Sequence, residues 1–336
     1  MKFSITSSLV FLAMFIALFF LFAHIETQTF TYHAETPLFA TKVTYKRYPN
    51  VLNFGDVLFD RGVRNIIENR GRDPFEYIKE DLESIEKYDV VIANLEGPII
   101  EIDRAFCQKK AYTFQFASTT PAYLKSAGIT MVNIANNHTN DCLSAGYVST
   151  KKYLDASEIS YIGDRNLDTS FVVKEIEGKK IAFIGIDETT EPITLEAFYP
   201  LIKKLAYEND YVVVNIHWGT EYLLIANETQ KNIAHTLIDN GADVIFGHHP
   251  HVIEPVEIYK DKAIFYSLGN FVFDQHGFEE TRGLGVGVEF RSDKNVFTLF
   301  PYTIKAFAPD FLKGDEKEIF CDTYLKKISH DRCEFE

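Results

Sequence analysis

The segment Asp243-Val244-Ile245-Phe246-Gly247-His248-His249-Pro250-His251 places three histidines directly behind a short apolar run. The run predicts a buried strand, and Gly247 and Pro250 predict a rigid turn after it. A lone histidine would more often be a packed core residue, but three imidazoles within four residues resist a packing explanation. We therefore predict that His249 and His251 converge on a metal ion.

Four earlier apolar runs also end in polar side chains that can bind a metal or an oxyanion. These runs and the residues that follow them are 51–54 with Asp56, 89–93 with Glu96, 129–134 with Asn137 and His138, and 211–216 with His217. Taken singly, each has an ordinary explanation, such as a turn residue, a surface carboxylate or a core histidine. Because ligand sites in α/β proteins lie beyond the carboxyl ends of strands, the common position predicts one shared site.

The chemistry of these side chains narrows the choice of metal. They offer carboxylate, amide and imidazole groups but no thiolate, which suits divalent Mn, Fe, Zn or Mg. A carboxylate that can bridge two ions fits a two-metal centre. In such a centre the paired ions stabilise both the attacking and the leaving oxygen of a displacement reaction. A neighbouring histidine would then protonate the leaving group. Glu221 and Asp141 are further candidates, although a hydrogen-bonding carboxylate on a loop explains either equally well.

The order of apolar runs predicts the fold class. Strands and amphipathic stretches alternate up to about residue 250, and strands alone follow. This pattern predicts an α/β protein with two sheets packed face to face and helices outside. The main domain is expected at 49–308 and a peripheral, charged tail at 309–336. Helices are predicted at 75–85, 144–156, 195–207 and 228–240.

The N-terminus carries an uninterrupted apolar run, residues 9–23, preceded by Lys2. Its length suits a signal-peptide core and, with its apolar neighbours, just suffices for a membrane span. We expect an uncleaved helical anchor in residues 1–25 and a tether at 26–48. The positive-inside rule then places a single-pass protein in the cell membrane with its domain outside the cytoplasm. Secretion after signal cleavage is the alternative.

Composition excludes some partners and permits disulfides. The net charge is −14, with 48 acidic residues against 34 Lys and Arg, so nucleic acid is not expected as a partner. Apolar residues make up 46% of the chain, enough for a large core. The four cysteines allow three disulfide connectivities, and we expect the neighbouring pairs Cys107–Cys142 and Cys321–Cys333. Buried free thiols are the alternative.

Six segments, in order along the chain, resemble the successive motifs of the CapA family. These segments are Asn53-Phe54-Gly55-Asp56-Val57, Ala93-Asn94-Leu95-Glu96-Gly97-Pro98-Ile99, Asn136-Asn137-His138, His217-Trp218-Gly219-Thr220-Glu221-Tyr222, Gly241 to Val252, and Tyr266-Ser267-Leu268-Gly269-Asn270-Phe271. The family comprises poly-gamma-glutamate capsule biosynthesis proteins, a branch of the calcineurin-like metallophosphoesterases. The resemblance spans roughly residues 50 to 305. It implies a four-layer α/β/β/α sandwich with a metal centre at the sheet edges.

The resemblance also implies roles for individual residues. His138 would be the general acid or stabilise the transition state, and Glu221 and Asn270 would orient the site. His248 occupies what looks like a variable position and is left outside the ligand set. The implied metal ligands, for two divalent ions, are Asp56, Glu96, Asn137, His217, His249 and His251.

The chain departs from the calcineurin-like pattern at one position. That pattern places a histidine two residues after the first Asp, where this chain has Leu58. One metal therefore has a poorer ligand set. Asp60 or Arg61 is a candidate for the vacated space. Arg61 could instead bind an anionic substrate or pair with an acid.

Three functions are compatible with these residues. The first is a metal-dependent phosphoesterase or hydrolase for capsule or cell-envelope polymer biosynthesis. The second is a non-catalytic accessory protein that binds and guides an anionic polymer during export, together with other capsule-synthesis membrane proteins. A glycosidase using Glu96 and Glu221 leaves the histidines unexplained. Specificity is expected in the loops 100–118 and 274–283. Tyr112-Thr113-Phe114 is expected to be a packed aromatic strand, with the lining of a substrate groove as the alternative.

Overall fold

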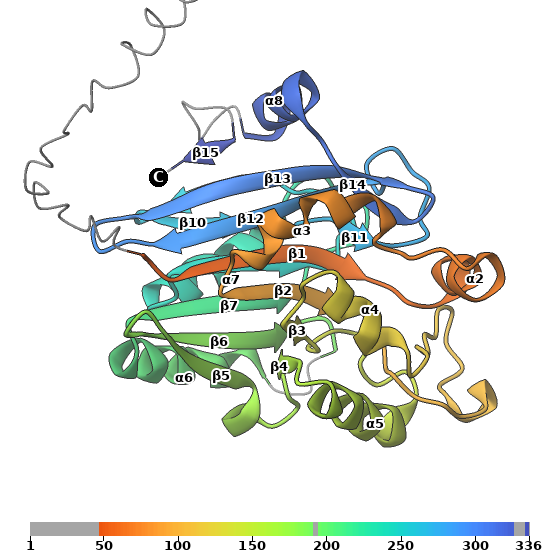
Figure 1. The fold of residues 1–336 in the computed structure, drawn as a ribbon. Helices are drawn as coiled ribbons and strands as arrows, with labels where there is room; N and C mark the ends of the chain where they lie inside the picture. Colours follow the sequence, from red (N-terminus) through yellow and green to blue (C-terminus); the bar gives the residue numbers. More distant parts are fainter. Residues whose placement is uncertain (1–46, 191–193, 326–332, 336) are drawn as a thin grey trace, which may run out of the picture. The chain divides into compact units, whose positions relative to one another are not determined.

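Two β-sheets form the centre of the fold (Figure 1). The structure is a computed structural model that describes residues 47–190, 194–325 and 333–335. Along the first sheet the strands run β14-β13-β12-β1-β2-β3-β4, with β11 beside β1 and β15 beside β13. Along the second they run β5-β6-β7-β8-β10-β9. The predicted α/β class is thus confirmed.

The elements have the following bounds. The first sheet contains β1 (Asn50–Val57), β2 (Val90–Leu95), β3 (Met131–Asn133), β4 (Ser160–Ile162), β11 (Asn270–Val272), β12 (Arg282–Phe290), β13 (Asn295–Lys305), β14 (Ala308–Phe311) and β15 (Glu334–Phe335). The second contains β5 (Phe171–Ile176), β6 (Lys179–Asp187), β7 (Tyr211–His217), β8 (Val244–His248), β9 (Val256–Tyr259) and β10 (Lys262–Phe265). The helices are α2 (Arg61–Arg70), α3 (Leu82–Glu86), α4 (Thr120–Ser126), α5 (Leu143–Ala156), α6 (Leu195–Glu208), α7 (Glu228–Asp239) and α8 (Gly314–Leu325), with 3₁₀ turns η1 (Glu76–Asp81), η2 (Arg104–Phe106) and η3 (Leu167–Thr169).

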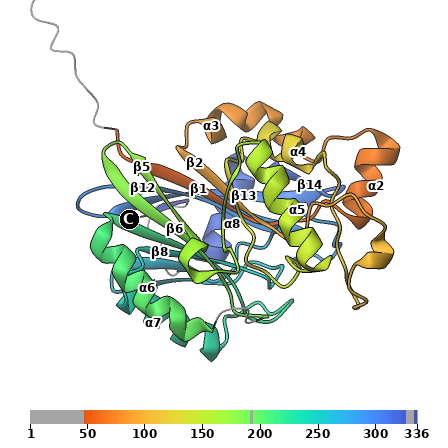
Figure 2. The ribbon, with the colours of Figure 1, turned by 90° about the horizontal axis from the view of Figure 1, so that it is seen from below.

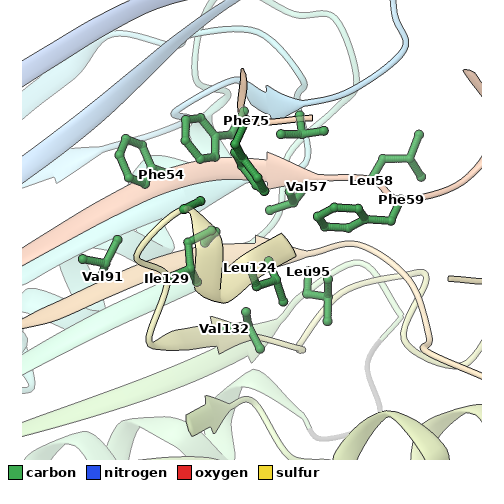
Figure 3. Close-up of a cluster of buried hydrophobic side chains, with 14 of the residues drawn as sticks. Phe54, Val57, Leu58, Phe59, Phe75, Val91, Leu95, Leu124, Ile129 and Val132 are labelled. Carbon is green, nitrogen blue, oxygen red and sulfur yellow. The ribbon is translucent and has the colours of Figure 1, made fainter. Parts of the chain in front are cut away.

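The side-chain alternation of the strands separates the fold into layers. In β7, Val213 packs in the cluster between the two sheets, whereas Val212 and Val214 pack in the cluster beneath α6 and α7. A third cluster lies between the first sheet and α2 to α5, and it contains Val57, Leu124 and Val132 (Figure 3). Figure 2 shows α4 and α5 on one side and α6 and α7 on the other. Strands that are buried on both faces read as continuous apolar runs, which explains why β7 was recognised.

Strand direction brings the polar strand ends together. β1, β2, β3 and β4 run parallel, as do β6, β7 and β8. Parallel neighbours end at the same edge of a sheet, so residues far apart in the chain meet there. The carboxyl ends of β1, β2, β3, β7 and β8 carry all the strand-end residues predicted above.

The structure differs from the sequence prediction around residues 60–86. The chain forms α2 at residues 61–70, a helix that was not predicted, with Asp60 as its N-cap. The predicted helix 75–85 is a 3₁₀ turn followed by the short α3. Because a 3₁₀ helix has three residues per turn, Phe75 and Ile78 remain on one face and are both buried.

The C-terminal residues are more than a peripheral tail. β14 and β15 pair with β13, and Phe320 and Phe335 belong to the apolar cluster between the sheets. The sequence of α8 is rich in charged residues, so its few apolar side chains did not indicate that this segment packs on the core.

The expectation of a single-pass membrane protein is corrected. Within the part of the chain that the structure describes, no helix is long and apolar enough to cross a bilayer. The apolar run 9–23, the anchor predicted at 1–25 and nearly all of the tether lie in residues 1–46, outside the described residues.

Both expected disulfides are present. Cys107 bonds to Cys142, and Cys321 bonds to Cys333. The first joins the loop before α4 to the start of α5 across 35 residues, and the second closes 12 residues at the C-terminus.

Removing the longer disulfide should destabilise the protein more than removing the shorter one. Loop-closure entropy predicts a loss of about 4 kcal/mol for Cys107→Ala/Cys142→Ala and about 3 kcal/mol for Cys321→Ala/Cys333→Ala. Guanidinium unfolding of the two double variants beside the wild type measures both. An unchanged unfolding midpoint in either variant would contradict the prediction.

Glu254 is a buried carboxylate beside α7 that should make stability depend on pH. Gln230 Nε2 donates to its Oε2 at 2.7 Å, while Oε1 has no hydrogen-bond partner among the described residues. Burial raises the pKa of Glu254 from 4.5 to about 7. In the unfolded chain, Glu254 therefore loses its proton at a lower pH than in the folded protein. The stability contributed by the protonated group is complete below pH 4.5 and is lost as the pH rises through about 7.

We expect Glu254→Gln, which keeps the uncharged shape, to raise the free energy of unfolding at about pH 8 by up to about 3 kcal/mol. The gain should shrink towards zero at about pH 4.5. Urea unfolding of the metal-free protein at several pH values measures it, with exposed Glu228→Gln as the control. A gain that is equal at every pH would show that ionisation of Glu254 is not the cause.

Candidate metal centre

Asp56, at the end of β1, is the central carboxylate of the site. Its side chain is 0% exposed. Asn94 Nδ2 donates to Oδ1 at 2.8 Å, and Oδ2 lies 3.2 Å from His251 Nδ1. Burial alone would raise the pKa of Asp56, but hydrogen bonds with His248 and His251 hold it well below its usual range. Asp56 is therefore held as an anion against two imidazoles.

Glu96 is buried without the contacts that a carboxylate requires. It follows β2 and is 0% exposed, and neither Oε1 nor Oε2 has a hydrogen-bond partner within the described residues. Its Oε1 lies 3.6 Å from His251 Nε2 and 3.8 Å from His138 Nε2. Burial raises the pKa of Glu96 well above its usual range. A buried carboxylate of this kind is stable as an anion only beside a cation.

The histidine turn after β8 has a strained backbone, and it brings the ring nitrogens of His249 and His251 to the site of Asp56 and Glu96. His249 and His251 have φ of 98° and 59°, values that side-chain-bearing residues rarely adopt. His249 Nδ1 is buried and lacks a hydrogen-bond partner in the described part of the chain. Burial opposes protonation of His251, but Glu96 and Asp56 raise its pKa to about 9. Such strain persists only where surrounding structure enforces it, and it is common at functional sites.

The second sheet completes the site through His217, at the end of β7. Its ring lies 4.7 Å from that of His249, and its Nε2 is 3.0 Å from Asn137 Oδ1. Burial lowers the pKa of His217 well below its usual value, so the ring is neutral and can act as a ligand. Asn137 reaches it from the loop after β3. The two sheets therefore face each other across the centre.

Two overlapping sets of ligand atoms suit divalent ions. Glu221, His249 and His251 form one set, and Asp56, Glu96 and His251 form the other, with the atoms of each set within 4.8 Å of one another. His251 belongs to both. Four of the six residues predicted as ligands, Asp56, Glu96, His249 and His251, belong to these sets. His217 lies beside His249, and Asn137 lies beside His217. Glu221, a further candidate to which the resemblance gives an orienting role, belongs to the first set. The unpartnered oxygens of Glu96 and the free nitrogen of His249 fit such ions.

His138, the predicted proton donor, stands beside Glu96 and forms a dyad with Asp141. His138 Nδ1 lies 2.8 Å from Asp141 Oδ2, and its ring stacks on Phe114 at 4.0 Å. Lys110 Nζ pairs with the other carboxylate oxygen at 2.5 Å. Because a carboxylate only accepts, Nδ1 carries the proton and Nε2 faces the centre. Burial lowers the pKa of His138 despite Asp141.

Three buried side chains next to the centre make hydrogen-bond contacts around it. Asn270, expected to orient the site, has Oδ1 3.0 Å from His251 Nδ1. His248, expected outside the ligand set, turns its Nε2 to Asn215 Oδ1 at 3.2 Å. Asn94 was not singled out from sequence, although a polar residue within the apolar strand 90–95 is a usable signal.

The position of the absent histidine is filled by core packing. Leu58 is fully buried among apolar residues such as Phe59 and Leu95 (Figure 3). Asp60 does not replace a ligand, because its Oδ1 accepts from Arg61 N at 2.8 Å and its Oδ2 from Gln115 N at 2.9 Å.

A hollow of about 280 Å³ leads to the centre, and we call it the first hollow. Arg61 lines it, paired with Asp274 and with its guanidinium 4.9 Å from the Phe114 ring. Tyr112 and Phe114 also line it, so this segment is a groove wall rather than the packed strand that was expected. The full lining is Arg61, Tyr112, Phe114, His138, Glu221, Tyr222, His251, Phe273, Asp274 and Gln275.

Comparison with known families agrees with this arrangement. The model of the bacterial capsule synthesis protein family, PGA_cap, matches residues 50–275 and so includes every residue of the centre described above. The chain belongs to this family. The predicted kinship with CapA proteins is thereby confirmed.

Two curated members of the capsule synthesis family are similar over long stretches. The PGA biosynthesis protein CapA of Bacillus subtilis (strain 168) is 32% identical over 300 residues, covering 82% of this chain and 77% of that protein. The capsule biosynthesis protein CapA of Bacillus anthracis is 33% identical over 251 residues, covering 68% of this chain and 60% of that protein.

A solved structure shares the fold. A hypothetical protein from Thermus thermophilus superposes with a TM-score of 0.50 at 20% identity, covering 76% of this chain and 99% of that one. At this level of identity the likeness concerns the fold alone.

Proposed function

We propose that the chain is a metal-dependent hydrolase of the phosphoesterase type that serves the biosynthesis of a capsule polymer of the poly-γ-glutamate class. The observation that carries the proposal is the buried, unpartnered carboxylate of Glu96 among imidazoles. Without a cation, burial of such a group has a large unfavourable free energy. The family and the names of its Bacillus members support the polymer.

The layered architecture supports a calcineurin-like fold. Three apolar clusters separate four layers, and the ligand atoms gather at the carboxyl ends of parallel strands from both sheets. Such an arrangement is the one expected of the four-layer α/β/β/α sandwich.

The proposed ligands hold one or two divalent ions, of Mn, Fe, Zn or Mg. Bound there, the ions supply Lewis acidity that activates water and stabilises negative charge. His138 holds or delivers a proton at Nε2, and Asp141 fixes its tautomer by accepting from Nδ1. Arg61, on the wall of the first hollow, binds an anionic group of the substrate. The ligands are Asp56, Glu96, Asn137, His217, His249 and His251, with Glu221 added by its position.

The full chain assayed with bis(p-nitrophenyl) phosphate and with poly-γ-glutamate tests the proposal. We expect turnover of at least one substrate with added manganese and its loss on chelation. Metal-loaded protein without turnover of either would overturn the hydrolase. Activity that survives chelation would instead favour a glycosidase using Glu96 and Glu221.

Leu58 favours a second candidate, a non-catalytic accessory protein that uses the metal to bind an anionic polymer. One ion lacks the histidine that the wider superfamily supplies, and neither Asp60 nor Arg61 takes its place. Manganese-dependent polymer binding that is equal in the wild type and His138→Ala, with no turnover in either, would establish this role.

A further inference from the structure

A second hollow, of about 340 Å³, lies on the other side of the loop that carries Asn137. It opens at the ends of β3, β4 and β6, where the edges of the two sheets meet. Ligands of α/β proteins bind beyond the carboxyl ends of strands, so this is a favourable position for a ligand. Neither the metal ligands nor the proton donor requires such a space. We call it the second hollow.

The wall between the two hollows consists of two short segments. Lys110 and Asn137 line the second hollow, whereas Tyr112 and His138 line the first. Lys110 Nζ donates to Asn137 O at 3.0 Å, which ties the two segments together. Asn137 Oδ1 meanwhile lies 3.0 Å from His217 Nε2 at the metal centre. Both hollows therefore flank the same centre.

The lining of the second hollow combines an apolar floor with a cationic rim. Ile134, Ala135 and Phe198 provide apolar surface, and Lys110 and Arg165 lie exposed at the rim. Lys110 Nζ is already paired with Asp141 at 2.5 Å, so Arg165 is the cation of the rim that has no carboxylate partner among the described residues. The guanidinium of Arg165 donates to one described acceptor, Asn140 Oδ1 at 3.2 Å, and retains further donors.

The acids that line the second hollow are already engaged. Asp164 pairs with Lys151 at 2.5 Å, and Asp187 Oδ1 accepts from Thr189 N at 2.9 Å. The guanidinium of Arg165 is therefore the part of the rim suited to an anionic group, and the floor suits methylene groups beside it.

We infer that the second hollow is a binding subsite for the polymer, so that an extended anionic chain lies across the metal centre with repeats in both hollows. This inference rests on the proposed function and specifies how the substrate lies. A repeat with a carboxylate and a short aliphatic stem matches the rim and the floor. A polymer that bound only by its end would occupy one hollow. A polymer that bound by its internal repeats would occupy both hollows.

Binding of γ-linked glutamate oligomers to the manganese-loaded full chain tests the inference by calorimetry. We expect an octamer to bind at least about tenfold more tightly than a dimer. Arg165→Glu, at an exposed position, should remove about tenfold of the octamer affinity and leave dimer affinity and manganese content unchanged. Gln108→Trp, which adds bulk at the rim, should have the same effect. Lys152→Glu on α5 reverses an equivalent exposed charge outside both hollows and should change nothing.

The outcomes separate the subsite from the hydrolase. Equal affinity for dimer and octamer, or octamer affinity that is unchanged in Arg165→Glu and Gln108→Trp, would overturn the subsite. An equal loss in Lys152→Glu would do the same, because it would reduce the effect to long-range charge. Length-dependent binding without turnover would overturn the hydrolase and leave the subsite supported. Binding of neither oligomer by the manganese-loaded wild type would overturn the subsite, whereas the hydrolase would fall only if bis(p-nitrophenyl) phosphate and the polymer both remained uncleaved.

Discussion

Replacing His251 by alanine should abolish divalent-metal binding at both sets of ligand atoms. His251 is the one side chain common to the two sets of ligand atoms, one with Glu221 and His249 and the other with Asp56 and Glu96. Its loss also leaves Glu96 without its nearest imidazole, 3.6 Å away. Loss of a merely supporting residue lowers metal affinity about 10–100-fold, and we expect the affinity for each ion to fall by more than that.

Metal content per chain, measured by inductively coupled plasma mass spectrometry after dialysis, distinguishes His251 from its neighbours. His249→Ala should lose one ion, because the set around Asp56 remains. His276 is an exposed histidine whose ring lies at a tilt against Phe307, and His276→Ala is the matched control that should retain the wild-type content. Full occupancy in His251→Ala would contradict the centre described here. A single ion in the wild type that is lost in His251→Ala would mean that only one set of ligand atoms is occupied. The empty set would then be explained by Leu58, which stands where the wider superfamily has a histidine.

Replacing His138 by alanine should lower turnover by about 10²–10⁴-fold, the usual contribution of a positioned proton donor or base. The metal content should stay that of the wild type, because His138 Nε2 stands 3.8 Å from Glu96 and belongs to neither ligand set. Steady-state kinetics with bis(p-nitrophenyl) phosphate, together with metal analysis, measures both effects. Wild-type turnover in His138→Ala would remove this residue from the mechanism.

Asp141 should act through His138 as a positioning residue. Asp141→Asn keeps the shape but no longer supplies a pure acceptor for Nδ1–H, so the ring can take the other tautomer. We expect a smaller fall in kcat than in His138→Ala and a displaced pH profile. Because Asp141 also accepts from Phe114 N, thermal unfolding of the variant is the control for a structural defect. A fall in kcat with an unmoved pH profile would indicate a structural role only.

The success of the sequence prediction has a local cause. The strands β1, β2, β3, β7 and β8 were recognised because their apolar runs are continuous and short, and the polar residue that ends each run marks its carboxyl end. The failures at 60–86 and in the C-terminal segment have a local cause too. A 3₁₀ turn and an α-helix share the spacing of Phe75 and Ile78, and the charges of α8 outnumber its few buried residues.

The sequence by itself determined the α/β class, the residues at the strand ends and the chemistry that they offer, because periodicity and residue type are properties of neighbouring positions. Only the tertiary structure decided which of these groups lack partners and which share them. It left both oxygens of Glu96 without a hydrogen-bond partner among the described residues, brought Glu221 within reach of His249 and His251, and coupled His138 to Asp141. Burial and hydrogen bonding depend on side chains that approach from other strands and loops, and those contacts exist only once the two sheets have packed together.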